Sequence, residues 1–172
     1  VKGDLAGISQ AGTPIDALME RAKKIEFDDY GLEATPTIFW DLFGEQGHPI
    51  RTTVSEMGPL MLSRLMGLSE AQEGALNIAF RLADTEGLAL LDLKDLRALL
   101  ADLAERGKEI TTQYGNVQSA TIGSIQRRLV VIEEQGGDKF FGEPALDIRD
   151  LMRTTRDGRG YMNILAADRL MS

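Results

Sequence analysis

One stretch, residues 35–56, constrains the fold more than any other because it has the pattern of a β-hairpin. It reads TPTIFWDLFGEQGHPIRTTVSE and contains the only tryptophan and the only histidine of the chain. The alternating residues are mostly large, apolar or β-branched: Ile38, Trp40 and Leu42 in one arm, Ile50, Thr52 and Val54 in the other. This alternation predicts a register that sets Asp41 opposite Arg51 and buries Trp40. Because a lone hairpin is unstable in water, we expect helices to cover the Trp40 face.

The rest of the chain is predicted to be mainly helical, because capping residues precede apolar residues spaced three and four apart. The predicted helices span residues 14–25, 59–66, 69–86, 92–106, 120–135 and 147–153. In the first of them the expected buried stripe is Ile15, Leu18, Met19, Ala22 and Ile25. Phe140 and Phe141 are expected to pack back on the domain. The apolar run from Tyr161 to Ala166 lacks alternation, which indicates a fully buried strand.

These elements predict a mainly α protein of the α+β class, with a bundle-like helical domain, one hairpin and short terminal strands. We expect a single domain or a fragment of one. Its predicted parts are a strand end and loop (1–12), a helix and connection (13–34), the hairpin (35–56), a helical region (57–153) and an apolar strand with the C-terminal end (160–172).

Composition excludes several classes of function. The 172 residues contain no cysteine, which excludes disulfides and thiolate metal sites, and one histidine is too few for a typical zinc centre. No window approaches the roughly 18 apolar residues of a membrane span, so we expect no membrane partner. The absence of cysteine fits a reducing cytoplasm, where we expect the protein. The formal charge of −8 opposes the broad attraction that non-specific nucleic-acid binders use. Any contact with DNA would have to be local.

Two short motifs imitate a nucleotide site without completing it. The apolar residues 88–91 run into Asp92 like a strand that ends in a magnesium-binding acid, but helical spacing continues after it. Helix capping by Asp92 is therefore the favoured interpretation. Gly107 and Lys108 are not a phosphate-binding loop, because Asp102 stands where the motif requires glycine. Nothing in this pattern predicts a metal site.

The remaining candidate side chains have ordinary explanations as well. His48 in the hairpin connection is expected to be exposed or locally hydrogen-bonded. Arg127 and Arg128 lie within a predicted helix, and one of them could act in trans on a nucleotide at a subunit boundary. A solvated helix face beside Glu133 and Glu134 is the favoured alternative. The acids elsewhere are dispersed, which gives glycosidase or aspartic-protease chemistry no support.

Seven blocks in a fixed order carry a family resemblance over essentially the whole chain: VKGDLAG, FWDLFGEQGHPIRTTVSEMGP, QEGALNIAFRLAD, LDLKDLRALL, TTQYGNVQSA, EEQGGDKFFGEPALDI and NILAAD. They resemble a bacterial branch of the HerA-like P-loop NTPases, which are related to the HerA and FtsK ATPases. The resemblance implies a RecA-like α/β core, magnesium-dependent ATP hydrolysis, assembly into a homo-oligomeric ring and DNA as a partner of the parent protein.

The same resemblance places the nucleotide motifs of that family outside these residues. Its phosphate-binding loop precedes the strand end matched by Lys2, Gly3 and Asp4, and its magnesium acid follows the strand matched by residues 161–167. Only Lys2, Gly3 and Asp4 can be carried over, as residues near the nucleotide edge. ATP and magnesium are thus implied for the parent protein, and no cofactor or metal for this part.

Both ends of the chain look cut, which predicts an internal fragment between the two nucleotide motifs that is catalytically silent alone. We expect its terminal segments to pair with each other, to pair with a second copy or to fray. An alternative interpretation is a helical protein-interaction or oligomerisation module without nucleotide chemistry. An independent acidic enzyme is the least favoured, since no catalytic constellation is complete.

Overall fold

The computed structural model describes residues 4–115 and 117–167, and the chain divides into two compact units. Unit 1 consists of Val1–His48 and Asp147–Ser172, and unit 2 of Pro49–Leu146. Unit 2 is therefore inserted, in sequence, into unit 1. The predicted fold class is confirmed, because the chain is mainly helical with a small sheet.

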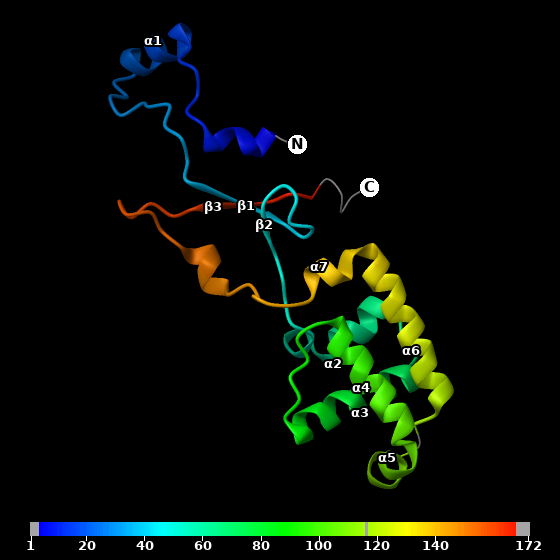
Figure 1. The fold of residues 1–172 in the computed structure, drawn as a ribbon. Helices are drawn as coiled ribbons and strands as arrows, with labels where there is room; N and C mark the ends of the chain where they lie inside the picture. Colours follow the sequence, from blue (N-terminus) through cyan, green and yellow to red (C-terminus); the bar gives the residue numbers. More distant parts are fainter. Residues whose placement is uncertain (1–3, 116, 168–172) are drawn as a thin grey trace. The chain divides into compact units, whose positions relative to one another are not determined.

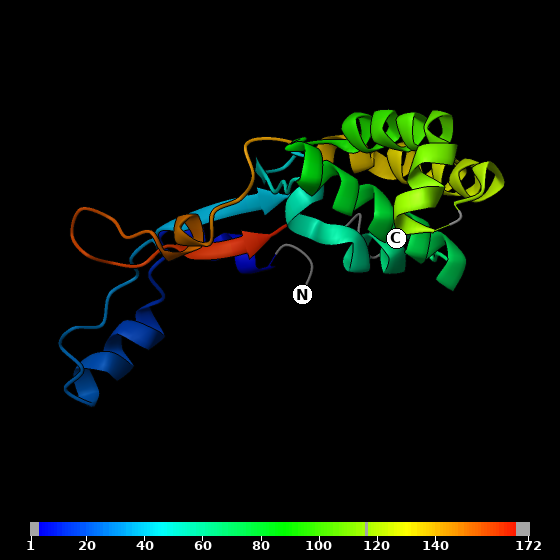
Figure 2. The same cartoon turned by 90° about the horizontal axis from the view of Figure 1, so that it is seen from below.

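A three-stranded sheet in the order β2-β1-β3 is the centre of unit 1. The strands are β1 (Thr37–Asp41), β2 (His48–Pro49) and β3 (Met162–Leu165). β1 and β3 run parallel, with Thr37 opposite Met162 and Trp40 opposite Leu165, and Figure 2 shows them as two arrows side by side. A parallel pair needs a crossover connection. Here the crossover contains all of unit 2.

The predicted hairpin register is wrong, although β1 and β2 are neighbours. β2 covers only His48–Pro49, and the Arg51 guanidinium donates to the Glu143 carbonyl oxygen at 2.8 Å. The predicted second arm ends at Thr53, whose hydroxyl accepts the Glu56 N–H at 3.1 Å and completes a capping box. A helix begins at Val54 because this capping box satisfies its first N–H groups.

Asp41 is buried, and its carboxylate organises the loop that follows β1. It accepts the backbone N–H groups of Phe43 at 3.0 Å, Glu45 at 2.7 Å and Gln46 at 2.8 Å. A Cβ at Gly47 would lie 2.6 Å from the carbonyl oxygen of Phe39. The loop thus requires glycine at position 47. Its backbone N–H groups bind the Asp41 carboxylate, which was expected to face Arg51.

The predicted burial of Trp40 is confirmed, at 9% exposure. Its indole N–H donates to the Asn163 Oδ1 atom of β3 at 2.8 Å, and its ring lies 5.9 Å from that of His48. This hydrogen bond satisfies the one polar atom that burying a tryptophan side chain would otherwise leave unpaired. His48 itself is exposed, as expected.

The N-terminal part of unit 1 differs from the prediction. Asp4 begins the 3-10 helix η1 (Asp4–Ser9) instead of ending a strand, and residues 1–3 lie outside the described residues. Helix α1 spans Asp16–Lys24. Of its expected buried stripe only Ala22 is buried, while Ile15 is 56% and Ile25 62% exposed. Most of the predicted stripe of α1 is therefore not buried within the described part of unit 1.

The C-terminal strand is predicted correctly as a strand, but it is not fully buried, since Met162 and Leu165 are each 46% exposed. Its partner is also not the expected one. β3 pairs with β1 of the same chain, a partner that the prediction did not include. The Met162 N–H donates to Pro36 O and the Ala166 N–H to Trp40 O, each at 2.8 Å. The short helix predicted before it is the 3-10 helix η3 (Ile148–Met152), capped by Asp147.

Unit 2 is a helical domain with its own core. Its elements are α2 (Val54–Met66), α3 (Glu70–Glu86), α4 (Leu93–Glu105), α5 (Gly107–Tyr114), α6 (Ser119–Ile132), the π-helix η2 (Glu133–Gly137) and α7 (Asp138–Phe140). α6 contacts α2, α3 and α4. Its predicted stripe is confirmed, since Ile122, Ile125, Leu129 and Ile132 are all buried. Phe141 packs into the same core at 3% exposure, as expected.

Most helix ends of unit 2 follow the predicted capping signals. Ser69 and Gln72 form the capping box of α3, and Asp92 caps α4. Gly67 and Gly87 end α2 and α3 in the left-handed conformation, with φ of 60° and 69°. α2 starts earlier than predicted. It contains a kink at Gly58, whose φ is 71°, and resumes at the predicted start.

The two segments at the base of unit 2 are bonded to each other. Thr52 donates its N–H to Phe140 O at 3.1 Å, and its own carbonyl accepts the Gly142 N–H at 2.9 Å. The Leu146 N–H donates to the Arg51 carbonyl at 2.9 Å. Figure 1 shows both segments leaving the helices at the same place. Hydrogen bonds within unit 2 therefore join the segment by which the chain enters it to the segment by which the chain leaves it, as is expected of an inserted domain.

Candidate functional site

The residues carried over by resemblance remain untested. Lys2 and Gly3 lie outside the described residues, and the structure describes the backbone of Asp4 but not its side chain.

Asp92 acts as the predicted helix cap. Its carboxylate accepts the N–H groups of Lys94 at 2.8 Å and Asp95 at 3.0 Å. Gly107 and Lys108 are part of helix α5, which agrees with the prediction that they form no phosphate-binding loop. Within residues 4–115 and 117–167, no group of three or more His, Cys, Asp or Glu side chains could hold a metal ion.

Arg127 and Arg128 are both exposed on α6. The Arg127 guanidinium donates to the Ser124 hydroxyl at 2.8 Å, one turn earlier in the helix. Glu133, which was expected to accompany them, instead pairs with Arg97 of α4 at 2.5 Å. This face of α6 is therefore exposed as expected, but Glu133 is engaged by a different helix.

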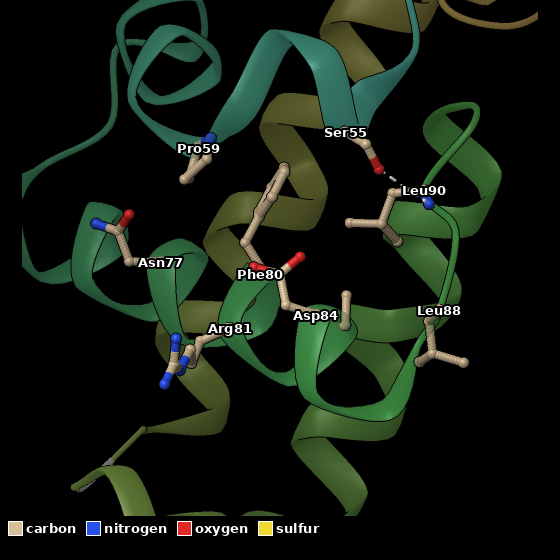
Figure 3. Close-up of a pocket in the computed structure, with 9 residues that line it drawn as sticks. Ser55, Pro59, Asn77, Phe80, Arg81, Asp84, Leu88 and Leu90 are labelled. Atoms are coloured by element: carbon tan, nitrogen blue, oxygen red, sulfur yellow. Dashed lines mark hydrogen bonds between the residues drawn. The ribbon is translucent and has the colours of Figure 1, made fainter.

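A groove lies between α2, α3 and the loop after α3 (Figure 3). It is lined by Ser55, Pro59, Asn77, Phe80, Arg81, Ala83, Asp84, Leu88 and Leu90. The Ser55 hydroxyl accepts the Leu90 N–H at 3.2 Å and fixes one wall. Asn77, Arg81 and Asp84 follow one face of α3 along the rim.

This groove combines an apolar floor with a rim of mixed charge. Phe80 and Leu90 of the floor are 8% and 2% exposed. An acid beside the rim's one arginine does not suit a polyphosphate, which requires concentrated positive charge and backbone N–H groups. The groove suits instead a neutral or amphipathic side chain. Sequence patterns did not single it out, because its two walls come from helices whose pairing cannot be read from periodicity.

Arg106 links three helices, a role that the sequence analysis did not predict. Its guanidinium bonds Glu86 of α3 at 2.8 Å, Asp102 of α4 at 3.1 Å and Glu109 of α5 at 3.1 Å. These carboxylates raise the pKa of Arg106 above its usual range, with Glu86 contributing most. The Arg106 hydrogen bond in turn lowers the pKa of Glu109. The cluster is structural, since the arginine's charge is fully engaged.

Replacing Arg106 by glutamine is expected to return the pKa of Glu109 to its ordinary range. A carboxylate with a lowered pKa stabilises the fold above its unfolded-state pKa, and that stability is lost as the pH falls through the folded value. The wild-type cluster should therefore weaken only in acid. A carboxyl-carbon NMR titration of Glu109 measures the shift, and Arg97→Gln, which removes a different ion pair, is the matched control. An unchanged Glu109 pKa in Arg106→Gln would contradict the pairing.

The described residues form a mainly helical α+β protein in which a helical unit is inserted, in sequence, between two parallel strands. The chain belongs to the family described as "Helicase HerA-like C-terminal", whose sequence model matches residues 1–172. This match confirms the resemblance to the HerA-like proteins. No curated protein and no solved structure matches the chain. Within the described part, no helix is long and apolar enough to traverse a lipid bilayer.

Proposed function

We propose that this chain is part of a cytoplasmic HerA-like ATPase whose hydrolysis of ATP drives movement along or remodelling of DNA, and that residues 1–172 are catalytically silent alone. The observation that carries the proposal is the family match over residues 1–172. In this proposal, unit 1 contributes strands to the ATPase core and unit 2 is an accessory domain inserted between them.

The residues described here do not fit ATP and magnesium by themselves. The sequence contains no G-x-x-x-x-G-K-[ST] loop. Asp92, the acid that most resembles a magnesium ligand, uses its carboxylate to cap α4. The nucleotide chemistry of the proposal therefore belongs to parts of the parent protein other than these residues.

The parallel pairing of β1 and β3 supports the assignment of unit 1 to a core of this class. Parallel sheets are buried between helices on both faces, and ligands of open α/β sheets bind beyond the carboxyl ends of the strands. The Asp41 loop lies at that end of β1. The exposed apolar side chains of Leu18 in α1, at 45%, and of Ile25 directly after it, at 62%, also fit a unit that packs against further layers.

The proposal predicts different behaviour for the parent protein and for this chain. The full-length protein is expected to hydrolyse ATP with magnesium, faster when duplex DNA is added. Calorimetry of residues 1–172 with magnesium and ATP is expected to give no binding, since the phosphate cradle and its lysine are absent. Magnesium-dependent binding at micromolar concentration would mean that the nucleotide site lies within residues 1–172. A full-length protein without ATPase activity would refute the function itself.

A protein-interaction or oligomerisation role for unit 2 is a second candidate, which an observation on its surface favours. Several large apolar side chains of α2 and α6 are exposed although the core beneath them is complete. The two candidates are compatible, since an accessory domain can assemble subunits of an ATPase. The two candidates differ in one requirement, because the ATPase function needs a nucleotide whereas assembly of subunits does not.

A further inference from the structure

We propose that unit 2 docks a basic, amphipathic segment of another protein along two adjacent grooves. The first groove is the one between α2 and α3 that Figure 3 shows. The second groove lies beside α4 and shares Leu88 and Leu90 with the first; its other lining residues include Glu86, Asp95, Leu99, Asp102 and Arg106. The proposal gives the interaction role of unit 2 a partner of stated chemistry. It requires no nucleotide, so it and the ATPase function can fail independently.

Residues 88–90 form the wall that the two grooves share, because Leu88 and Leu90 line both of them. Hydrogen bonds fix this wall before any partner binds. The Leu88 N–H donates to the Ala83 carbonyl at 2.9 Å, and the Leu90 N–H donates to the Ser55 hydroxyl at 3.2 Å. A wall that is already ordered loses little entropy when a partner packs against it, which favours binding.

Both grooves offer apolar surface to a partner. Leu88 is 46% exposed, whereas Leu90 and Leu99 are buried at 2% and 5%. The grooves have volumes of 320 and 420 Å³, at the lower end of the range of about 300–1,000 Å³ for small-ligand sites. Each groove therefore accommodates one or two side chains and not a whole helix. A segment that places apolar side chains on both sides of Leu88 fits this shape.

The charges in the two grooves select a basic partner. Four carboxylates, of Asp84, Glu86, Asp95 and Asp102, line the grooves against two guanidiniums, of Arg81 and Arg106. Arg106 is already engaged, because its guanidinium bonds three carboxylates. Arg81 is thus the one cation outside that cluster among the described residues that line the grooves. Lys94 and Arg97 of α4 line neither groove, and Arg97 pairs with Glu133.

Asp84 is the carboxylate that is best placed to receive a basic side chain. Figure 3 shows the Arg81 guanidinium pointing away from the Asp84 carboxylate, and no ion pair joins these two side chains in the described part of the chain. Lysine and arginine lay their methylene stems along apolar surface and keep the charged end in water. A basic side chain over the floor of the first groove therefore satisfies both the floor and Asp84.

A designed peptide tests the docking on residues 1–172 by following the amide signals in nitrogen-15 NMR spectra. The probe, about 12 residues long, carries leucines at helical spacing among lysines and arginines. One control peptide has glutamate at every basic position, and another has the same composition in scrambled order. The basic peptide is expected to shift the signals of Asn77, Asp84 and Leu88, and to bind at least about tenfold more tightly than either control. Equal binding by the three peptides, or largest shifts on α6, would overturn the proposal.

Two substitutions on neighbouring turns of α3 are expected to change the affinity in opposite directions. Asp84→Asn removes the receiving carboxylate and should weaken binding of the basic peptide by about fivefold, whereas Arg81→Gln removes a like charge and should tighten it by about twofold. Glu70→Gln is the matched control, because it removes one carboxylate from the same helix outside both grooves. Equal weakening by Asp84→Asn and Glu70→Gln would reduce the effect to general attraction by an acidic chain, and the proposal would be wrong.

A second pair of variants tests the apolar half of the contact. Leu88→Gln should weaken binding of the basic peptide, and Leu60→Gln should not, because Leu60 is similarly exposed, at 51%, but lines neither groove. Unchanged circular dichroism confirms that each variant folds. Sedimentation equilibrium of residues 1–172 without peptide identifies the occupant. A dimer that Asp84→Asn dissociates would assign the grooves to a second copy of the chain and overturn the proposal, as would equal peptide binding by the two leucine variants.

Discussion

Residues 49–146 produced alone are expected to fold cooperatively, with the helical circular dichroism and the single sharp thermal transition of a small domain. The hydrophobic core cluster of the chain lies wholly within these residues. A chain of about 100 residues is long enough to bury a core of this kind. The hydrogen bonds of Thr52 with Phe140 and Gly142 tie the two ends together without help from unit 1.

The matched control is a shorter version, residues 49–139, which keeps the long helices but lacks the returning segment. It loses Phe141, which is 3% exposed, and the N–H groups of Gly142 and Leu146 that bond the entering segment. Deleting a buried phenylalanine side chain alone costs about 3–5 kcal/mol. We expect the shorter version to melt at a much lower temperature or to be unfolded. A broad, non-cooperative transition for 49–146 itself would show that its core depends on unit 1.

The helices α2, α3, α4 and α6 of unit 2 could be predicted from sequence because their signals are local, whereas α5 was not among the predicted helices. The leucines of α4 and the isoleucines of α6 are spaced for one buried face, and the caps at Ser69 and Asp92 mark where helices begin. Such signals lie within a few residues of the structure they determine. The tertiary structure then determines only which helices pack against these apolar faces.

The prediction of the second hairpin arm is wrong because two local signals, one for a strand and one for a helix start, overlap in the same residues. Alternation of Ile50, Thr52 and Val54 is typical of a strand, but Thr53 and Glu56 have the spacing of a capping box. The capping box prevails, since it satisfies the first N–H groups of α2 within the segment itself. A longer second strand would have to pair with β1 along its whole length. After the Asp41 loop, the strand β2 covers only His48–Pro49.

Contacts between residues far apart in the sequence could not be predicted from periodicity. The Trp40 and Asn163 side chains bond across 123 positions of sequence, and nothing near either residue specifies the other. The same limit applies to the candidate sites. The cap at Asp92 was predictable, whereas the three carboxylates around Arg106 come from three helices and become visible only when α3, α4 and α5 are packed.

The α1 helix shows what an amphipathic pattern does and does not establish. Its apolar residues are spaced for burial, yet Ile15 and Leu18 remain exposed. Periodicity indicates that a face is made to be covered, but it does not say which surface covers it. The exposed faces of α2 and α6 differ from that of α1, because each of those helices also buries an opposite face in a complete core.

Truncating Leu129 to alanine is expected to lower the free energy of unfolding of unit 2 by about 2–5 kcal/mol. Leu129 is fully buried in α6, the helix that contacts α2, α3 and α4, so the cavity would be enclosed by several helices and could not collapse without moving them. Leu65→Ala removes the same atoms from a side chain that is 56% exposed and should change stability by no more than about 0.5 kcal/mol.

Urea unfolding followed by far-ultraviolet circular dichroism compares the two variants, at protein concentrations low enough to keep the chain monomeric. A lower midpoint with an unchanged slope for Leu129→Ala indicates a loss of stability without a change in the surface exposed on unfolding. Equal costs for the two variants would mean that α6 is not the centre of the core. The contrast also separates the two kinds of apolar residue in these helices, because Leu129 supports the fold, whereas Leu65 lies outside the core.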